Sequence, residues 1–293
     1  MYDRLLFPTD GSDGASVAFD HVLAIAARHD ATVYVLNVAD TTRDSVLRIR
    51  GDVVDALERE GHRIVQDVTE RAAQRGVTTV TDVLQGDPSR TIVDYANARD
   101  VDLVVMPTHG RRGLERFLLG STTERVVRRS DVPVLTLRPD HDDPARYPYR
   151  NVVVPTDGSD CADHALETGV DVAAAEGATL HLLSVIVSVS LGVDVRSDLQ
   201  IEPLERRATG LIEDAREYAQ TAGVTSVTGT VEYGPSVHGG ITSYVDEHDV
   251  DLVVVGTHGR TGVDRYVLGS VTERLVRTSP VPVLTVREPP EDA

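Results

Sequence analysis

The sequence predicts an α/β fold of two tandem doubly wound domains, each built on a five-stranded parallel sheet in the order 3-2-1-4-5, a Rossmann-like arrangement. Three observations predict this fold. The chain has 293 residues, enough for two domains of about 150 residues each. Its motifs occur twice in the same order, and in each copy strand-length apolar runs alternate with amphipathic helical stretches.

Three motifs carry the internal repeat at nearly constant spacing. They are FPTDGSD at 7–13 and VPTDGSD at 154–160, THGR at 108–111 and 257–260, and PVLT at 133–136 and 282–285. A polar run with two prolines, at 139–144, is typical of a linker. We therefore expect one domain over residues 1–140 and a second over residues 150–293.

Both copies follow the same order of elements. In the first copy we expect strands at 4–8, 32–38, 79–84, 103–106 and 134–137, alternating with helices at 12–29, 53–74, 88–99 and 121–129. In the second copy we expect strands at 152–154, 180–186, 226–232, 252–255 and 283–286, alternating with helices at 162–176, 204–222, 236–248 and 271–277. The segments 39–52 and 187–202 differ most between the copies, and we interpret them as lids or mobile connections.

The charge of the chain excludes several classes of function. Its 47 acidic and 29 basic residues give a formal net charge of −18, and such a surface repels nucleic acid and anionic membranes. No lysine is present, so the chain has no Walker A loop, no Schiff base for pyridoxal phosphate and no kinase strand lysine. An acidic surface without lysine is typical of a halophilic cytoplasm, or it reflects biased codon usage.

The sequence predicts neither a signal peptide nor a membrane span. Residues 1–4 run directly into a strand pattern, and the apolar runs fall well short of the ~20 residues of a membrane helix. Cys161 is the one cysteine, so an intrachain disulfide is impossible and a zinc–thiolate cluster is not expected. It stands where the first copy has Gly14, and we interpret it as packing filler. We therefore expect a cytoplasmic protein.

Two loops in each copy follow the carboxyl ends of strands and are candidates for ligand contact. One is PTDGS after the first strand, and the other is THGR after the fourth. In a sheet ordered 3-2-1-4-5 these two strands are neighbours whose connections leave in opposite directions. Open α/β sheets bind ligands at this switch point, so we expect both loops to meet at one crevice.

The fourth-strand loop of the second copy has the features of a phosphate site. Gly256 and Gly259 are followed after nine residues by Gly269 and Ser270, where a helix begins. Glycines let the backbone approach a phosphate closely and adopt positive φ, and a helix start offers free N–H groups to anions. Two arginines of the intervening loop add charge-assisted contacts: Arg260 and Arg265.

These residues also have structural interpretations. SVTE at 270–273 and STTE at 121–124 match capping boxes, in which the serines would cap the helices. The glycines are alternatively turn residues. Asp157 either binds ribose or a metal ion, or forms a turn. His258 is interpreted as orienting its loop.

The motifs resemble those of the universal stress protein family, in its ATP-binding branch, over residues 2–138 and 150–287. The second copy matches the whole phosphate motif of that family, Gly-x₂-Gly-x₉-Gly-Ser/Thr. The resemblance implies a site for ATP, AMP or ADP. Mg²⁺ would bridge the phosphates and Asp157, since this ion commonly needs only one or two protein carboxylates beside them. The candidate cofactor-binding residues of the second copy are Pro155, Thr156, Asp157, Val185, Gly256, His258, Gly259, Gly269, Ser270, Val271 and Thr272.

The first copy departs from the family motif at one position. Pro107 replaces the first glycine, and proline fixes φ and removes an N–H. The first copy can still bind a nucleotide if that position needs only a close approach of the backbone to the ligand. Nucleotide binding by the first copy therefore depends on whether Pro107 is tolerated. Its other candidate residues are Pro8, Thr9, Asp10, Val38, Gly110, Gly120 and Ser121.

The sequence leaves a leading function and one alternative, and it argues against a third. The leading hypothesis is a cytoplasmic stress-response protein that binds an adenine nucleotide as a ligand-responsive module, with at most slow ATP hydrolysis because no general base is evident. The alternative is a nucleotide-independent scaffold for dimerisation or partner binding. A nucleotidyl transferase or ATP pyrophosphatase would need a His-x-Gly-His or Ser-Gly-Gly signature by the first strand, and none is there.

The resemblance also implies association through the last strands. Residues 134–137 and 283–286 are apolar on both faces, which would be a liability on an exposed sheet edge. We expect them to pair within one chain as a pseudo-dimer, and further association into a homodimer of chains is the second expectation.

Overall fold

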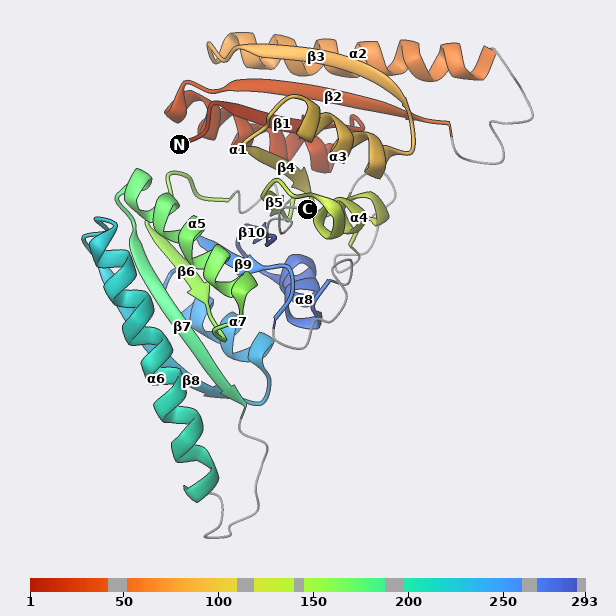
Figure 1. Cartoon of the computed structure of the whole chain (residues 1–293). Coiled ribbons are helices and arrows are strands. Elements are labelled where there is room, and N and C mark those ends of the chain that lie inside the picture. Colours follow the sequence, from red (N-terminus) through yellow and green to blue (C-terminus); the bar gives the residue numbers. More distant parts are fainter. Residues whose placement is uncertain (42–51, 110–118, 140–144, 188–197, 260–267, 289–293) are drawn as a thin grey trace. The chain divides into compact units, whose positions relative to one another are not determined.

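The computed structural model describes residues 1–41, 52–109, 119–139, 145–187, 198–259 and 268–288. The chain divides into two compact units, Met1–Tyr147 and Pro148–Ala293. In each unit strands and helices alternate around a parallel sheet, as Figure 1 shows, and the predicted fold class is confirmed.

The first unit has five strands and four helices. They are β1 (Arg4–Pro8), α1 (Asp13–His29), β2 (Thr32–Asp40), α2 (Asp52–Gln74), β3 (Thr79–Gly86), α3 (Pro88–Ala98), β4 (Leu103–Pro107), α4 (Ser121–Arg129) and β5 (Val134–Leu137). The strands run in the order β3-β2-β1-β4-β5, and all four neighbouring pairs are parallel. This is the predicted order.

The second unit repeats the arrangement. Its elements are β6 (Asn151–Pro155), α5 (Asp160–Glu176), β7 (Thr179–Val187), α6 (Asp198–Thr221), β8 (Val227–Gly234), α7 (Val237–Glu247), β9 (Leu252–Gly256), α8 (Ser270–Thr278) and β10 (Val283–Val286). The strand order is β8-β7-β6-β9-β10, again parallel. The helix expected from residue 204 begins earlier, at Asp198, so that Pro203 lies inside α6. Proline removes only one helical hydrogen bond there, and this 24-residue helix continues through it.

The helices of the first unit pack in two pairs on the sheet. Arg71 of α2 hydrogen-bonds Ser16 of α1 and lies over the ring of Phe19, while α3 contacts α4. Right-handed crossovers in a sheet of this order place one such pair on each face. The strands between them are buried on both faces, which explains why β1 and β4 read as continuous apolar runs.

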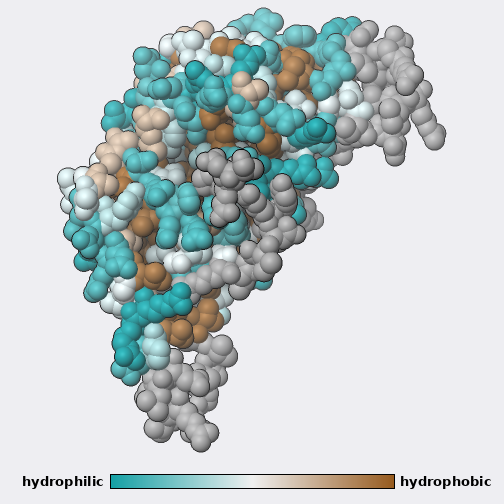
Figure 2. Space-filling model, in the orientation of Figure 1, coloured by the Kyte–Doolittle hydropathy of each residue, from teal (hydrophilic) through white to brown (hydrophobic). Residues whose placement is uncertain are grey.

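The surface of the molecule is largely hydrophilic in the view shown. Figure 2 shows hydrophilic residues over most of the coloured surface, with hydrophobic residues in scattered patches. Among the residues that the structure describes, no helix combines the length and the apolar character that a membrane crossing requires.

Candidate functional site

The crevice of the second unit lies where β6 and β9 separate. The register between these strands ends with Val153 opposite Val253. Beyond it the Thr156 N–H donates to a β7 carbonyl at 2.8 Å, and the Thr257 N–H donates to a β10 carbonyl at 2.9 Å. Each strand therefore follows its outer neighbour, and a gap opens at the carboxyl edge of the sheet, the switch point expected from the sequence.

Asp157 and Gly259 bring the two loops together at this gap. A Cβ on Gly259 would lie 2.8 Å from Asp157 Oδ2, closer than side-chain atoms pack without a shift. The backbone of the β9 loop thus lies directly against the carboxylate of the β6 loop. The convergence of the two loops that the topology predicts is present.

The β6 loop is shaped by its own polar side chains. Thr156 Oγ1 accepts from the Gly158 N–H at 3.1 Å, and Asp157 Oδ1 accepts from the Ser159 N–H at 3.0 Å. Gly158 has a φ of 71°, which the turn requires. Ser159 then caps α5 by accepting from the Ala162 N–H at 3.3 Å. Asp157 therefore forms a turn with one carboxylate oxygen while its exposed side chain faces Gly259.

The β9 loop is closed by two hydrogen bonds at its base. The Gly269 N–H donates to Thr257 O at 2.8 Å, and Thr272 Oγ1 donates to Gly256 O at 2.7 Å. Thr272 is buried, so its hydroxyl holds the strand end in place. Thr257 Oγ1 and His258 Nδ1 are hydrogen-bonded at 3.2 Å, which fits the interpretation of His258 as a residue that orients the loop.

The capping-box interpretation of the two serines is wrong. Gly269 is the N-cap of α8 and Gly120 is the N-cap of α4, and neither helix has a side-chain cap bond. Ser270 and Ser121 lie one position inside their helices, because the S-x-x-E pattern is shifted by one residue from a true capping box. By contrast, α1, α3, α5 and α7 are each capped by a Ser or Asp side chain.

This difference makes the start of α8 a candidate anion site. The first N–H groups of a helix lack intrahelical partners, and the N-cap of α8, Gly269, makes no side-chain hydrogen bond to them. The exposed Ser270 lies on the same turn, with the half-buried Val271 beside it. A phosphate group fits this combination of free donors and positive helix-dipole end.

The glycines of the motif serve close packing instead of the positive φ expected from the sequence. In the described chain, the glycines with positive φ include Gly11 and Gly158 but none of the motif glycines. A Cβ on Gly256 would lie 2.7 Å from Cys161 O and 2.8 Å from Cys161 Sγ. Gly256 is therefore required by the first turn of α5, against which the strand end packs. Cys161 is buried in this contact, as its interpretation as filler expects.

Val185 borders the same edge from β7. A Cβ on Gly240 of α7 would lie 2.7 Å from Val185 Cγ1, so the Val185 side chain is engaged with α7. Only its backbone can serve a ligand at the crevice, which is the kind of contact that the family resemblance implies. Pro155 is half-buried at the end of β6.

The first unit builds a crevice with closely similar bonds. The Gly120 N–H donates to Thr108 O at 2.7 Å, and Thr123 Oγ1 donates to Pro107 O at 3.0 Å. Asp10 Oδ1 accepts from the Ser12 N–H at 3.0 Å. Pro8 and Thr9 are buried at the end of β1, and Val38 is half-buried in β2. Gly110, Arg260 and Arg265 lie outside the described residues.

Two polar residues of the first crevice were not singled out from the sequence. Asn37 of β2 donates from Nδ2 to Thr9 O at 2.8 Å and is buried; the second unit has Ser184 in its place. Burial and, to a lesser extent, the charge of Arg138 lower the pKa of His109. His109 therefore favours its neutral form beside the loop.

A metal ion has no ready-made protein cage here. Within the described ranges, no group of three or more His, Cys, Asp or Glu side chains could hold one. Asp157 is a single carboxylate at the crevice, and Mg²⁺ commonly binds through one or two carboxylates together with substrate phosphates. Asp157 is thus chemically suited to a phosphate-bridged ion only.

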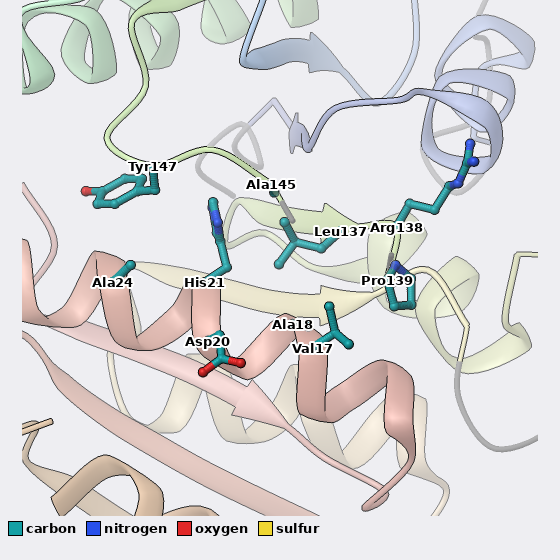
Figure 3. Close-up of a pocket in the computed structure, with 10 residues that line it drawn as sticks. All are labelled: Val17, Ala18, Asp20, His21, Ala24, Leu137, Arg138, Pro139, Ala145 and Tyr147. Carbon is teal, nitrogen blue, oxygen red and sulfur yellow. The ribbon is translucent and has the colours of Figure 1, made fainter. Parts of the chain in front are cut away.

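A separate cavity of about 140 Å³ lies in the first unit. It is bounded by α1, residues 137–139, Ala145 and Tyr147, and Figure 3 shows the His21 ring rising from α1 between Tyr147 and Leu137 in this view. Ligand pockets usually measure roughly 300–1,000 Å³. The cavity is too small for a nucleotide, so we assign it to the packing of residues 137–139, Ala145 and Tyr147 on α1. Tyr147 Oη and His29 Nε2 are hydrogen-bonded at 3.0 Å in that packing.

Comparison with known proteins identifies the family. The model of the Universal stress protein family matches residues 1–138 and 148–287, and the chain belongs to this family with two copies of its domain. Universal stress protein MJ0531 of Methanocaldococcus jannaschii is 38% identical over 141 residues, which cover 47% of this chain and 83% of that protein.

Two longer matches cover both units. Universal stress protein Rv2005c of Mycobacterium tuberculosis is 27% identical over 248 residues, covering 79% of this chain and 78% of that protein. The crystal structure of a universal stress protein from Archaeoglobus fulgidus has a TM-score of 0.73 and 25% identity, covering 97% of this chain and 98% of that chain. The tandem organisation is therefore shared with other members of the family.

Proposed function

We propose that the second unit binds an adenine nucleotide, with ATP as the leading ligand, and that the chain acts as a cytoplasmic, ligand-responsive stress protein. One observation carries the proposal. The start of α8, which has no side-chain cap, follows the loop whose Gly259 lies against the Asp157 carboxylate. A phosphate site and a polar residue suited to ribose thus share one crevice at the switch point.

The orientation of the ligand follows from the donors. The phosphates lie against Gly259, the Gly269 backbone and the first turn of α8, with Ser270 as a hydroxyl donor. The base and ribose lie against the β6 loop and the backbone of Val185. Mg²⁺, where present, bridges the phosphates and Asp157.

We expect at most slow hydrolysis of ATP at this site. In the described part of the loop the titratable side chain is His258, whose Nδ1 is hydrogen-bonded to Thr257. The side chain of Asp157 shapes its own turn. Binding and slow turnover suit a sensor whose state follows nucleotide concentration.

Calorimetric titration of the full chain in high potassium chloride tests this function. We expect micromolar-range binding of ATP and weaker binding of AMP, because the additional phosphates meet the free N–H groups of α8. Absence of binding for both nucleotides would contradict the proposal and leave the scaffold for partner binding as the better account. GTP in a parallel titration tests selectivity for adenine.

Association through the last strands stays a prediction. Light scattering of the full chain, with crosslinking of variants that carry shortened linkers, tests both the intrachain pseudo-dimer and a homodimer of chains. Independent units in these experiments would contradict the intrachain pairing.

A further inference from the structure

At the base of the crevice, a glycine occupies the strand end in one unit and the first turn of the facing helix in the other. In the second unit the strand end is Gly256 and the facing helix residue is Cys161. In the first unit the strand end is Pro107 and the equivalent helix residue is Gly14, since Ser12 and Ser159 are the matching N-caps. Each unit thus has one glycine in this pair of positions, on opposite sides.

The glycine of each unit avoids a different steric contact. In the second unit a Cβ at residue 256 would meet both the carbonyl and the sulfur of Cys161, at 2.7 and 2.8 Å. The strand end can carry a Cβ only if the first turn of the helix shifts. In the first unit that turn lies against His109 O and Pro139 Cγ, which a Cβ on Gly14 would approach to 2.9 and 3.0 Å. The helix turn can therefore take this position only with glycine at residue 14.

Proline at the strand end costs no hydrogen bond to β5. The Val104 N–H donates to Pro133 O, just before β5, at 3.0 Å, and the Thr108 N–H donates to Leu137 O of β5 at 2.8 Å. Since donors alternate along a strand, the nitrogen of Pro107 faces the other side, where the register of β1 with β4 has ended at Leu6 and Val104. Pro107 is therefore compatible with the ladder.

The phosphate loops keep the same closing bonds in spite of the exchange. The bond that closes the loop measures 2.7 Å at Gly120 and 2.8 Å at Gly269. The threonine hydroxyl reaches the strand-end carbonyl at 3.0 Å in one unit and 2.7 Å in the other. The backbone around the helix start is thus retained with proline in place of glycine.

We propose that the helix residue of this pair, Gly14 or Cys161, is a positioning residue for the phosphate loop and decides whether the strand end must be glycine. Pro107 paired with Gly14 keeps the first crevice competent, so the chain has two nucleotide sites. The claim of two nucleotide sites rests on the proposed function. The dependence of the strand-end residue on the helix residue rests on packing alone.

A reciprocal exchange tests the pairing in the full chain. In the second unit we compare Gly256→Pro with Gly256→Pro/Cys161→Gly; in the first unit we compare Gly14→Cys with Gly14→Cys/Pro107→Gly. Each single change is expected to lower the Tm and to weaken ATP binding at its own unit by about tenfold or more, and each double change to restore most of both. Gly14→Ala serves as a milder variant if Gly14→Cys does not fold.

The two readouts separate the two claims. If the wild-type chain binds no nucleotide, the proposed function fails, while recovery of Tm in the double variants still supports the pairing. Additive losses of Tm in the double variants would overturn the pairing. One ATP per wild-type chain, lost entirely when Gly256 is replaced and not recovered with Cys161→Gly, would show that Pro107 disables the first crevice.

Discussion

A Gly259→Asp substitution is expected to raise the Kd for ATP at the second unit by about a hundredfold or more, roughly 2.7 kcal/mol of binding free energy. The position has no room for a side chain, because its Cβ would lie 2.8 Å from Asp157 Oδ2. The added carboxylate would face both Asp157 and the phosphates, and like charges at such short distances repel. Calorimetric titration with ATP measures the loss.

Gly210→Asp is the matched control for this variant. Gly210 lies in α6, and a Cβ there would have nothing within 4 Å. It changes the net charge by the same amount without entering the crevice. Unaltered ATP binding in Gly259→Asp, with both variants folded, would show that the phosphates do not lie where we propose.

The second large effect concerns acid stability and His21. Burial lowers the pKa of His21 from 6.5 to about 4, partly offset by a hydrogen bond to the Ala145 backbone. The unfolded chain takes up this proton near pH 6.5 but the folded chain does so only near pH 4, so stability falls as the pH drops through this window. The loss attributable to His21 is about 3 kcal/mol in the free energy of unfolding.

His21→Gln isolates this contribution from that of the carboxylates. Glutamine does not titrate, so the variant should lose less stability than the wild type between pH 7 and pH 4, measured by chemical denaturation. His62→Gln, at an exposed position of α2, is the control and should follow the wild type. Equal pH dependence in His21→Gln and the wild type would contradict the buried, neutral state of His21.

The order of elements was predictable because apolar periodicity and the repeat agree. Strands buried on both faces leave continuous apolar runs, and Gly and Pro mark the loops between them. The point where β6 and β9 separate followed from topology alone. The family motif then located the glycines and the serine of the crevice.

Other features of the site depend on contacts that a single sequence does not display. The S-x-x-E pattern at 270–273 predicts a cap as readily as a first helical turn, and only the backbone shows that Gly269 takes the cap. The need for Gly256 arises from the carbonyl of Cys161, which is distant in sequence. Aligning the two copies shows that the glycine stands at the strand end in the second copy and in the helix, as Gly14, in the first. The contacts that each glycine avoids are visible only in the structure.

Hydrogen exchange of the full chain with and without ATP tests the central claim most directly. The account predicts slower exchange in two separate segments of the second unit, the β6 loop at 156–159 and the loop end and helix start at 268–272, with AMP protecting the second segment less. Unchanged exchange in both segments at saturating ATP, or protection confined to other parts of the chain, would contradict a nucleotide site formed by Asp157, Gly259 and α8.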